Sequence, residues 1–304
     1  MTPDPEAIAN CVLETFDQLP DKRKPRPRTD GAREWVPLAG IVLVDKGMPG
    51  PIHASRSVVS SYSSSSEDGN LSTGMKCLPS NKLPLANGNA LHDWHAEVLA
   101  LRALNRFLLD ESTSLLSSMT SMLISPRNAY LRSLTIPSSQ HVPAACERAF
   151  SRSGRMKGVT EDMAKQWQGG YTWHAFEVHS THREFDWSRR AIRDGLKAAP
   201  SNLSAVWTPM WQETLIGGVL QGRKQFDPRG ASAICRRSMW KVALQIASVA
   251  GVPTLSRALG KARYEEVKAN EVLVDRRKVK EDVRREGLRG WAKNTGDDDF
   301  GLEA

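Results

Sequence analysis

The sequence has 304 residues, of which 40% are hydrophobic and 25% charged, with a formal net charge of +8. This content is enough for a full hydrophobic core and excludes a purely disordered tail. The excess of positive charge favours a polyanionic partner such as nucleic acid.

The four cysteines lie far apart in the sequence, and no two have C-x-x-C spacing. This usage excludes a disulfide-rich secreted scaffold and indicates a reducing compartment. No apolar run approaches the ~20 residues of a membrane span, and none follows a basic N-terminus as in a signal peptide. We therefore expect a cytoplasmic or nuclear protein.

The N-terminal part predicts one helix and two strands. Apolar residues recur at helical spacing over residues 5–19. Residues 20–30 form a basic loop, which is either a solvated connector or a contact for phosphate. The apolar run 35–44 and the segment 71–78 are predicted strands, and the Ser-rich segment 47–69 between them is a predicted surface loop.

A predicted helix over residues 94–109 carries His95 and Glu97 in its first turn, with Asp93 as the expected N-cap. In zinc-dependent nucleobase deaminases, the His of a His-x-Glu pattern holds the metal and the Glu carries protons. Two side chains that are two residues apart on a helix do not face each other. The pattern therefore works only in the first turn, where a pocket over the helix end can contact both side chains. An ordinary helix surface also satisfies it. The apolar residues predict a buried face made of Trp94, Val98, Leu101, Leu104 and Leu108.

The rest of the chain predicts alternating helices and strands. Polar residues 110–114 separate the first helix from a second one at 115–124, and a strand at 130–136 and a short helix at 144–150 follow. Segments 204–211 and 213–221 predict a hairpin in which Gly217 and Gly218 mark a bulge or a close backbone approach. A helix is expected at 231–249. Residues 255–291 read as charged helix, with twelve basic and seven acidic residues between positions 257 and 293.

Several of these segments together resemble the adenosine deaminase (A-to-I editase) family, and within it the fungal tRNA-specific members. They are residues 72–79 (STGMKCLP), 88–99 (GNALHDWHAEVL), 207–209 (WTP), 213–224 (ETLIGGVLQGRK) and Trp291. The resemblance implies a single domain over residues 1–304 with an α/β fold, a deaminase-like mixed sheet flanked by helices. It also implies a hydrolase of tRNA processing and RNA editing, in which zinc-bound water attacks adenosine and leaves inosine.

The resemblance also implies roles for individual residues. His95 corresponds to the zinc ligand and Glu97 to the catalytic proton carrier. Lys76 falls where the family approaches the target nucleotide, and Arg223 and Lys224 are expected to meet RNA phosphates. Four further positions correspond to contacts of a buried inositol hexakisphosphate in family members: Arg102, Tyr264, Lys268 and Trp291. Editing enzymes for double-stranded RNA carry Arg-Arg where this chain has Leu101-Arg102.

The chain departs from the family in its metal ligands. The family supplies two cysteines, from Pro-Cys-Gly and Ser-Cys-Ser-Asp-Lys segments, and neither motif occurs here. The passage from Glu111 to Ser112 fits a missing block, through splicing, a faulty gene model or true loss, so we expect an incomplete fold and zinc site. Three readings stay open: a zinc-dependent tRNA adenosine deaminase, a catalytically inactive RNA-binding remnant, and an unstable truncated product.

Overall fold

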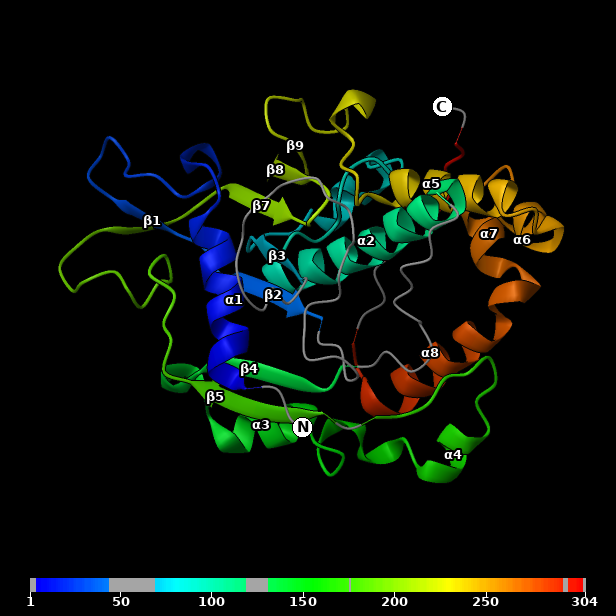
Figure 1. Cartoon of the computed structure of the whole chain (residues 1–304), viewed down its shortest axis with the longest axis horizontal. Helices are drawn as coiled ribbons and strands as arrows, with labels where there is room; N and C mark the ends of the chain where they lie inside the picture. The colour runs from blue at the N-terminus through cyan, green and yellow to red at the C-terminus, as the bar shows by residue number, and fades with distance from the viewer. Residues whose placement is uncertain (1–3, 44–68, 119–130, 175, 292–294, 303–304) are drawn as a thin grey trace.

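A five-stranded antiparallel sheet lies between two helices at the centre of the protein (Figure 1). The computed structural model describes residues 4–43, 69–118, 131–174, 176–291 and 295–302. The strand order is β2 (Leu38–Val42), β3 (Gly69–Thr73), β7 (Leu203–Trp207), β8 (Gln212–Ile216) and β9 (Val219–Leu220). The predicted hairpin is confirmed in β7 and β8, and the segment 213–221 turns back at Gly217 and Gly218.

The two faces of the sheet pack against different helices, because successive side chains of a strand alternate between the faces. Leu71 and Ala205 pack with Phe16 and Leu19, at and just beyond the end of α1 (Pro5–Asp17). Val206 packs on the opposite face, in the cluster that contains Leu99 of α2 (Ala96–Ser118). Because successive residues of a strand point to opposite faces, one sheet serves both cores. The protein is therefore layered as helix, sheet and helix.

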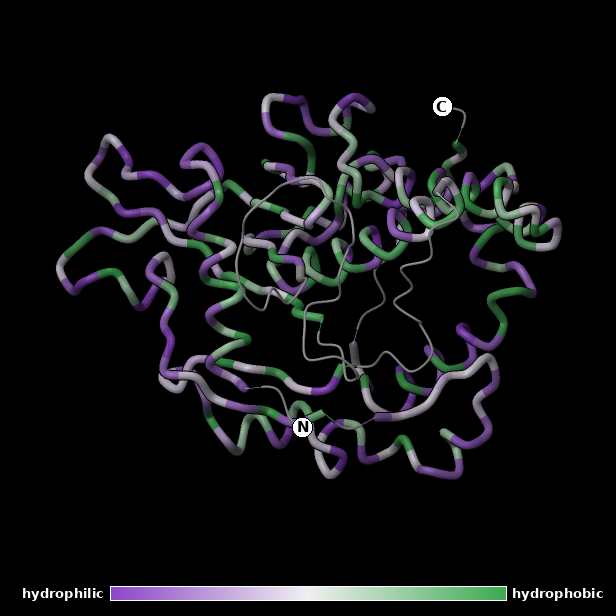
Figure 2. Tube along the Cα trace, in the orientation of Figure 1, coloured by the Kyte–Doolittle hydropathy of each residue, from purple (hydrophilic) through white to green (hydrophobic). Residues whose placement is uncertain are grey.

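The buried side of α2 differs from the predicted one. Leu101 and Leu108 are 57% and 39% exposed, so their prediction as core residues is wrong. Small residues decide the orientation, because they let the helix axis lie close to the sheet, and a shift of one position rotates the buried face by about 100°. Hydrophobic and hydrophilic residues alternate along α2, as in a helix with one covered side (Figure 2). The residues that face the core are Ala96, Leu99, Ala100, Ala103 and Phe107.

The predicted interruption of this helix at residues 110–114 is also wrong, since α2 continues to Ser118. The hydroxyls of Ser112 and Thr113 donate to the carbonyls of Leu108 and Leu109, at 2.7 and 3.0 Å. Such bonds to the preceding turn satisfy polar side chains within a helix. Residues 119–124 of the predicted second helix lie outside the described residues.

Two small parallel sheets flank the main one. β1 (Arg33–Trp35) pairs with β6 (Ala198–Pro200), and β4 (Ser133–Pro137) pairs with β5 (Glu177–Thr181). The predicted strand 35–44 is thus split, because Pro37 has no N–H for a ladder. The α/β class is confirmed. The remaining helices are α3 (Pro143–Phe150), α4 (Glu161–Lys165), α5 (Arg236–Val249), α6 (Pro253–Leu259), α7 (Tyr264–Ala269) and α8 (Val274–Gly287).

The predicted helical segment 255–291 is broken into α6, α7 and α8. α6 ends at Gly260, and the side chain of Asn270 accepts from the backbone N–H of Val272 and starts a new turn. In α5, Trp240 and Ala247 are buried, whereas the apolar residues Met239, Val242 and Ile246 are half-buried. Among the described residues, no helix is long and apolar enough to cross a bilayer.

A glycine at the turn between β8 and β9 is expected to be required for stability. The φ angles of Gly218 and Gly170 are +81° and +78°, so alanine is strained at both. A Cβ at Gly218 would lie 2.7 Å from the carbonyl oxygen of Leu91, whereas nothing lies within 4 Å at Gly170. Gly218→Ala should therefore cost about 1–3 kcal/mol more than Gly170→Ala in urea unfolding. An equal loss of unfolding free energy in both variants would mean that Leu91 moves away from the new Cβ at no cost.

Candidate functional site

Backbone hydrogen bonds hold the segment before α2 against the end of the sheet. The N–H groups of Trp94 and Ala96 donate to the carbonyls of Lys76 and Gly74, at 2.9 and 2.8 Å, and that of Leu91 donates to Gly218 at 2.9 Å. A Cβ on Gly74 would lie 2.1 Å from the carbonyl oxygen of Trp94, so only glycine fits there. The sheet therefore fixes where α2 begins.

Asp93 holds the imidazole of His95. One carboxylate oxygen lies 2.7 Å from Nδ1 of His95 and 2.9 Å from its backbone nitrogen. The predicted capping role is shifted, because the carbonyl of His95 accepts the first helical bond, from Leu99, and Asp93 caps His95 rather than the first turn. With Nδ1–H donated to the carboxylate, Nε2 is the ring nitrogen with a lone pair for a ligand. The side chain of His95 is 45% exposed.

Glu97 lies exposed in the first turn of α2, two residues after His95. The unpaired N–H groups of a helix start favour a carboxylate there. The structure thus puts the predicted ligand and the predicted proton carrier at one helix end. A helix-stabilising glutamate would occupy the same place.

The described residues do not provide a full zinc site around His95. Within the parts of the chain that the structure describes, no three His, Cys, Asp or Glu side chains form a metal-binding group. Cys77 bridges to Asp93 through its backbone and has an exposed side chain. Burial raises the pKa of the Cys235 thiol, which donates to Ser238 Oγ at 3.1 Å. Tight zinc sites use three or four protein ligands, so the donors present do not fit.

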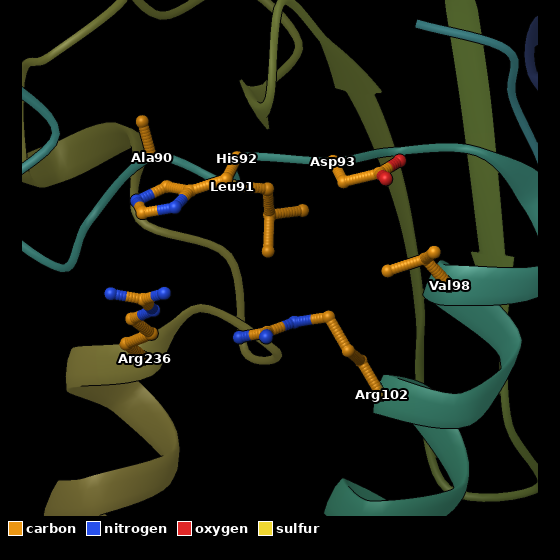
Figure 3. Close-up of a pocket in the computed structure, with 7 residues that line it drawn as sticks. All are labelled: Ala90, Leu91, His92, Asp93, Val98, Arg102 and Arg236. Atoms are coloured by element: carbon orange, nitrogen blue, oxygen red, sulfur yellow. The ribbon is translucent and has the colours of Figure 1, made fainter. Parts of the chain in front are cut away.

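A cavity of about 170 Å³ lies beside this segment, between α2 and the start of α5 (Figure 3). Arg102 and Arg236 reach toward it from the two helices, with His92 at its edge. Arg102 donates to the carbonyl of Ile234 at 2.8 and 2.5 Å, and burial lowers its pKa. The Nδ1 atom of His92 is buried and has no partner among the described residues. The cavity therefore offers two cations to an anion.

Two of the remaining expected polyphosphate residues, Tyr264 and Lys268, do not line the cavity but connect to its Arg236 through the ring of Tyr264. The ring of Tyr264 lies 4.9 Å from Lys268 Nζ and 5.9 Å from the guanidinium of Arg236. Trp291 is 61% exposed, and the guanidinium of Arg155 lies 5.2 Å from its ring. Sequence reasoning missed His92 and Arg236. Their signals were a second histidine three residues before His95 and a basic pair opening α5.

The expected RNA-contacting residues lie on the surface near the sheet ends. Lys76 Nζ donates to the side-chain oxygen of Asn202, just before β7. Arg223 and Lys224 are exposed in the turn after β9. Among the residues that the structure describes, the lining of the cavity does not include Lys76, Arg223 or Lys224.

Residues 70–129 match the family model of the adenosine-deaminase (editase) domain. This segment contains Lys76, His95, Glu97 and Arg102, and over these residues the predicted resemblance to the family is confirmed. Its relatives include proteins named tRNA-specific adenosine deaminase 1. Those from Schizosaccharomyces pombe, Saccharomyces cerevisiae and Homo sapiens are 39%, 32% and 35% identical over 104, 105 and 114 residues.

The matched region covers 34–35% of this chain and only 20–23% of those relatives. The chain thus corresponds to less than a quarter of the length of the relatives it matches. The activity of the full-length relatives can therefore only be proposed for this chain.

The purified 304-residue chain is expected to hold far less than one zinc ion per molecule after dialysis against a chelator. The reason is that His95 lacks partner ligands among the described residues. Elemental analysis beside protein quantification measures it, with His95→Ala as the matched control. One zinc ion per unaltered chain that is lost in His95→Ala would contradict this expectation. It would show that residues outside the described ones complete the ligand set of His95.

Proposed function

We propose that this protein acts on tRNA as an adenosine deaminase, converting adenosine to inosine by hydrolysis. The observation that carries the proposal is the editase match at residues 70–129, which contains His95 and Glu97 at one helix end. The relatives named tRNA-specific adenosine deaminase 1 support tRNA as the RNA.

In this proposal Glu97 is the acid–base group. Its exposed carboxylate takes a proton from the water that attacks C6 and returns it as the amino group leaves as ammonia. Adenosine and water are thereby converted to inosine and ammonia. Zinc is the metal that the family uses for this chemistry, with His95 as a ligand, but the described donors do not complete such a site.

The cationic surfaces support RNA as the partner. Lys76, Arg223 and Lys224 present ammonium and guanidinium groups near the ends of the sheet, and the whole chain carries a net charge of +8. Neutralised phosphates release counterions, which makes such binding sensitive to salt. These contacts need no metal and no chemistry.

A second candidate function is RNA binding without deamination. It is favoured by a specific feature of the site: the carboxylate of Asp93 is occupied by His95, and Cys235 is buried and bonded to Ser238. In the described part of the chain these donors leave no place for tight zinc, while the cationic surfaces remain. The two candidates differ only in whether inosine forms.

The deciding experiment measures tRNA binding and inosine formation with the same preparation. Both candidates predict tRNA binding whose affinity falls steeply with salt, and Lys76→Ala should reduce the slope of log K against log salt by about 1. Binding that is flat between low and physiological salt would contradict both.

The enzyme candidate further predicts inosine, read by sequencing, and at least a ~100-fold loss of rate in Glu97→Gln. Glu161→Gln, in the exposed first turn of α4, is the matched control and should keep full activity. Binding without inosine would establish the second candidate. Inosine formation that is unchanged in Glu97→Gln would remove the role assigned to Glu97.

We also propose that the cavity near Arg102 binds inositol hexakisphosphate, the polyphosphate that the family resemblance implies. Arg102 and Arg236, which line the cavity, support an anionic ligand, and Lys268 adds positive charge beside the ring of Tyr264 that contacts Arg236. The exposure of Trp291 and its contact with Arg155 do not support its predicted place in this site.

Inositol hexakisphosphate is expected to raise the melting temperature of the chain, and Lys268→Met should weaken its binding at least about tenfold. A charged hydrogen bond is worth about 1.5–3 kcal/mol, which is a factor of roughly ten or more. Calorimetric titration measures the affinity. Lys261→Met, an exposed lysine before α7, should leave it unchanged. Equal effects of the two variants would mean that the polyphosphate binds by general charge.

A further inference from the structure

Residues 297–300 form a short segment, named here the C-terminal strap, that lies against α7. The backbone N–H groups of Tyr264 and Glu265 donate to the carbonyls of Phe300 and Asp298, at 2.9 and 3.0 Å. The rings of Phe300 and Tyr264 stack, with centroids 4.9 Å apart and planes 18° apart. The strap is therefore fixed to α7 by both backbone and side chain.

From this position the strap reaches the loop that precedes His95. One carboxylate oxygen of Asp297 accepts from the backbone N–H of Gly88 at 2.8 Å, and the other lies 2.7 Å from Nε2 of His92. The side chains of Asp297 and His92 are only 2% and 8% exposed. A buried carboxylate is stable only with such partners, so this contact is specific rather than incidental.

A second contact fixes the strap on the same loop. Gly88 has a φ of +68°, and a Cβ there would lie 2.4 Å from the ring of Phe300. The ring thus packs directly on the glycine backbone. Arg237 closes the other side, because its backbone N–H donates to the carbonyl of Gly88 at 3.0 Å and its guanidinium lies 5.4 Å from the ring of Phe300.

Residues 88–95 connect the strap to the candidate site. The carbonyl of His92 accepts from the backbone N–H of Leu78 at 2.7 Å, and the N–H of Trp94 donates to Lys76. His95 follows directly. The segment 88–95 is therefore held by the strap at its beginning and by residues 76–78 at its end.

We propose that Asp297 is a positioning residue that acts through His92 to fix the segment carrying His95. It touches neither of the groups assigned to chemistry. The importance of the segment rests on the proposed function, but the effect of Asp297 on its order does not. A carboxylate that served only the overall fold would stabilise the sheet and the segment alike, and this difference makes the proposal testable.

The experiment is hydrogen exchange of the full chain, resolved by residue. In Asp297→Ala the amides of Leu91 and Trp94 should exchange at least about tenfold faster, while amides of β7 and β8 stay protected. Asp299→Ala is the matched control, because Asp299 is 70% exposed and pairs with Arg263; it should change neither set. Unchanged exchange at Leu91 and Trp94, or an equal rise in β7 and β8, would overturn the proposal.

A double-mutant cycle tests whether Asp297 acts through His92. His92→Ala should accelerate the same amides, and the double variant should exchange no faster than either single variant. Additive effects would overturn the route through His92. Where an alanine variant does not fold, Asp297→Asn keeps the side-chain shape, and its exchange should rise at the same two amides and nowhere else.

Binding of tRNA by the same variants separates this proposal from the proposed function. Should the unaltered chain fail to bind tRNA, the proposed function fails while the exchange data still decide the role of Asp297. Conversely, tRNA binding with unchanged exchange in Asp297→Ala would leave the function standing and overturn the positioning role.

Discussion

The candidate site depends on the close approach of two backbone segments, residues 74–78 and 91–96. The N–H and carbonyl groups of these segments lie 2.7–2.9 Å apart, and a Cβ would lie 2.1 Å from the carbonyl oxygen of Trp94 at Gly74 and 2.7 Å from that of Leu91 at Gly218. Only glycine fits at these two positions. Buried peptide groups must be paired, so this arrangement has few alternatives. The direction of α2, and with it the position of His95 and Glu97, follows from these bonds.

The two arginines that line the cavity differ in their partners. Arg236 meets the carbonyl of Asp297 at 2.6 Å and the carboxylate of Asp298 at 2.9 Å, so part of the positive charge opening α5 is neutralised by the strap. Arg102 donates to a neutral carbonyl, and burial lowers its pKa because no carboxylate compensates for lost hydration. An anion in the adjoining cavity would supply that compensation, which gives a physical reason for a polyphosphate there.

Local patterns in the sequence were sufficient for some elements but not for their orientation. The alternation and turn glycines of residues 204–221 predicted the hairpin correctly, because both signals are local. On α2, however, the large apolar residues misled, since Leu101 and Leu108 are exposed while Ala100 and Ala103 are buried. Helix orientation was set by how closely the backbone could approach the sheet, which hydrophobicity does not encode.

Some residues of the candidate site could be identified from the sequence, and others could not. His95 and Glu97 could be identified because they are two residues apart and match a chemical pattern. His92 and Asp297 could not, because 205 residues separate them and neither is unusual in its local context. Their pairing depends on the folded path of the strap over α7, and only the three-dimensional arrangement reveals it.

The two candidate functions share nearly all of this structure. The crossing of backbones, the cavity, the strap and the cationic surfaces are equally useful to an enzyme and to an RNA-binding protein. Only the ligands around His95 distinguish them, and there Asp93 is already used to orient the imidazole. An orienting carboxylate is valuable to a metal ligand, because it fixes the tautomer that leaves Nε2 free to coordinate. The arrangement at His95 is thus that of a prepared ligand, while the described donors do not supply its partners.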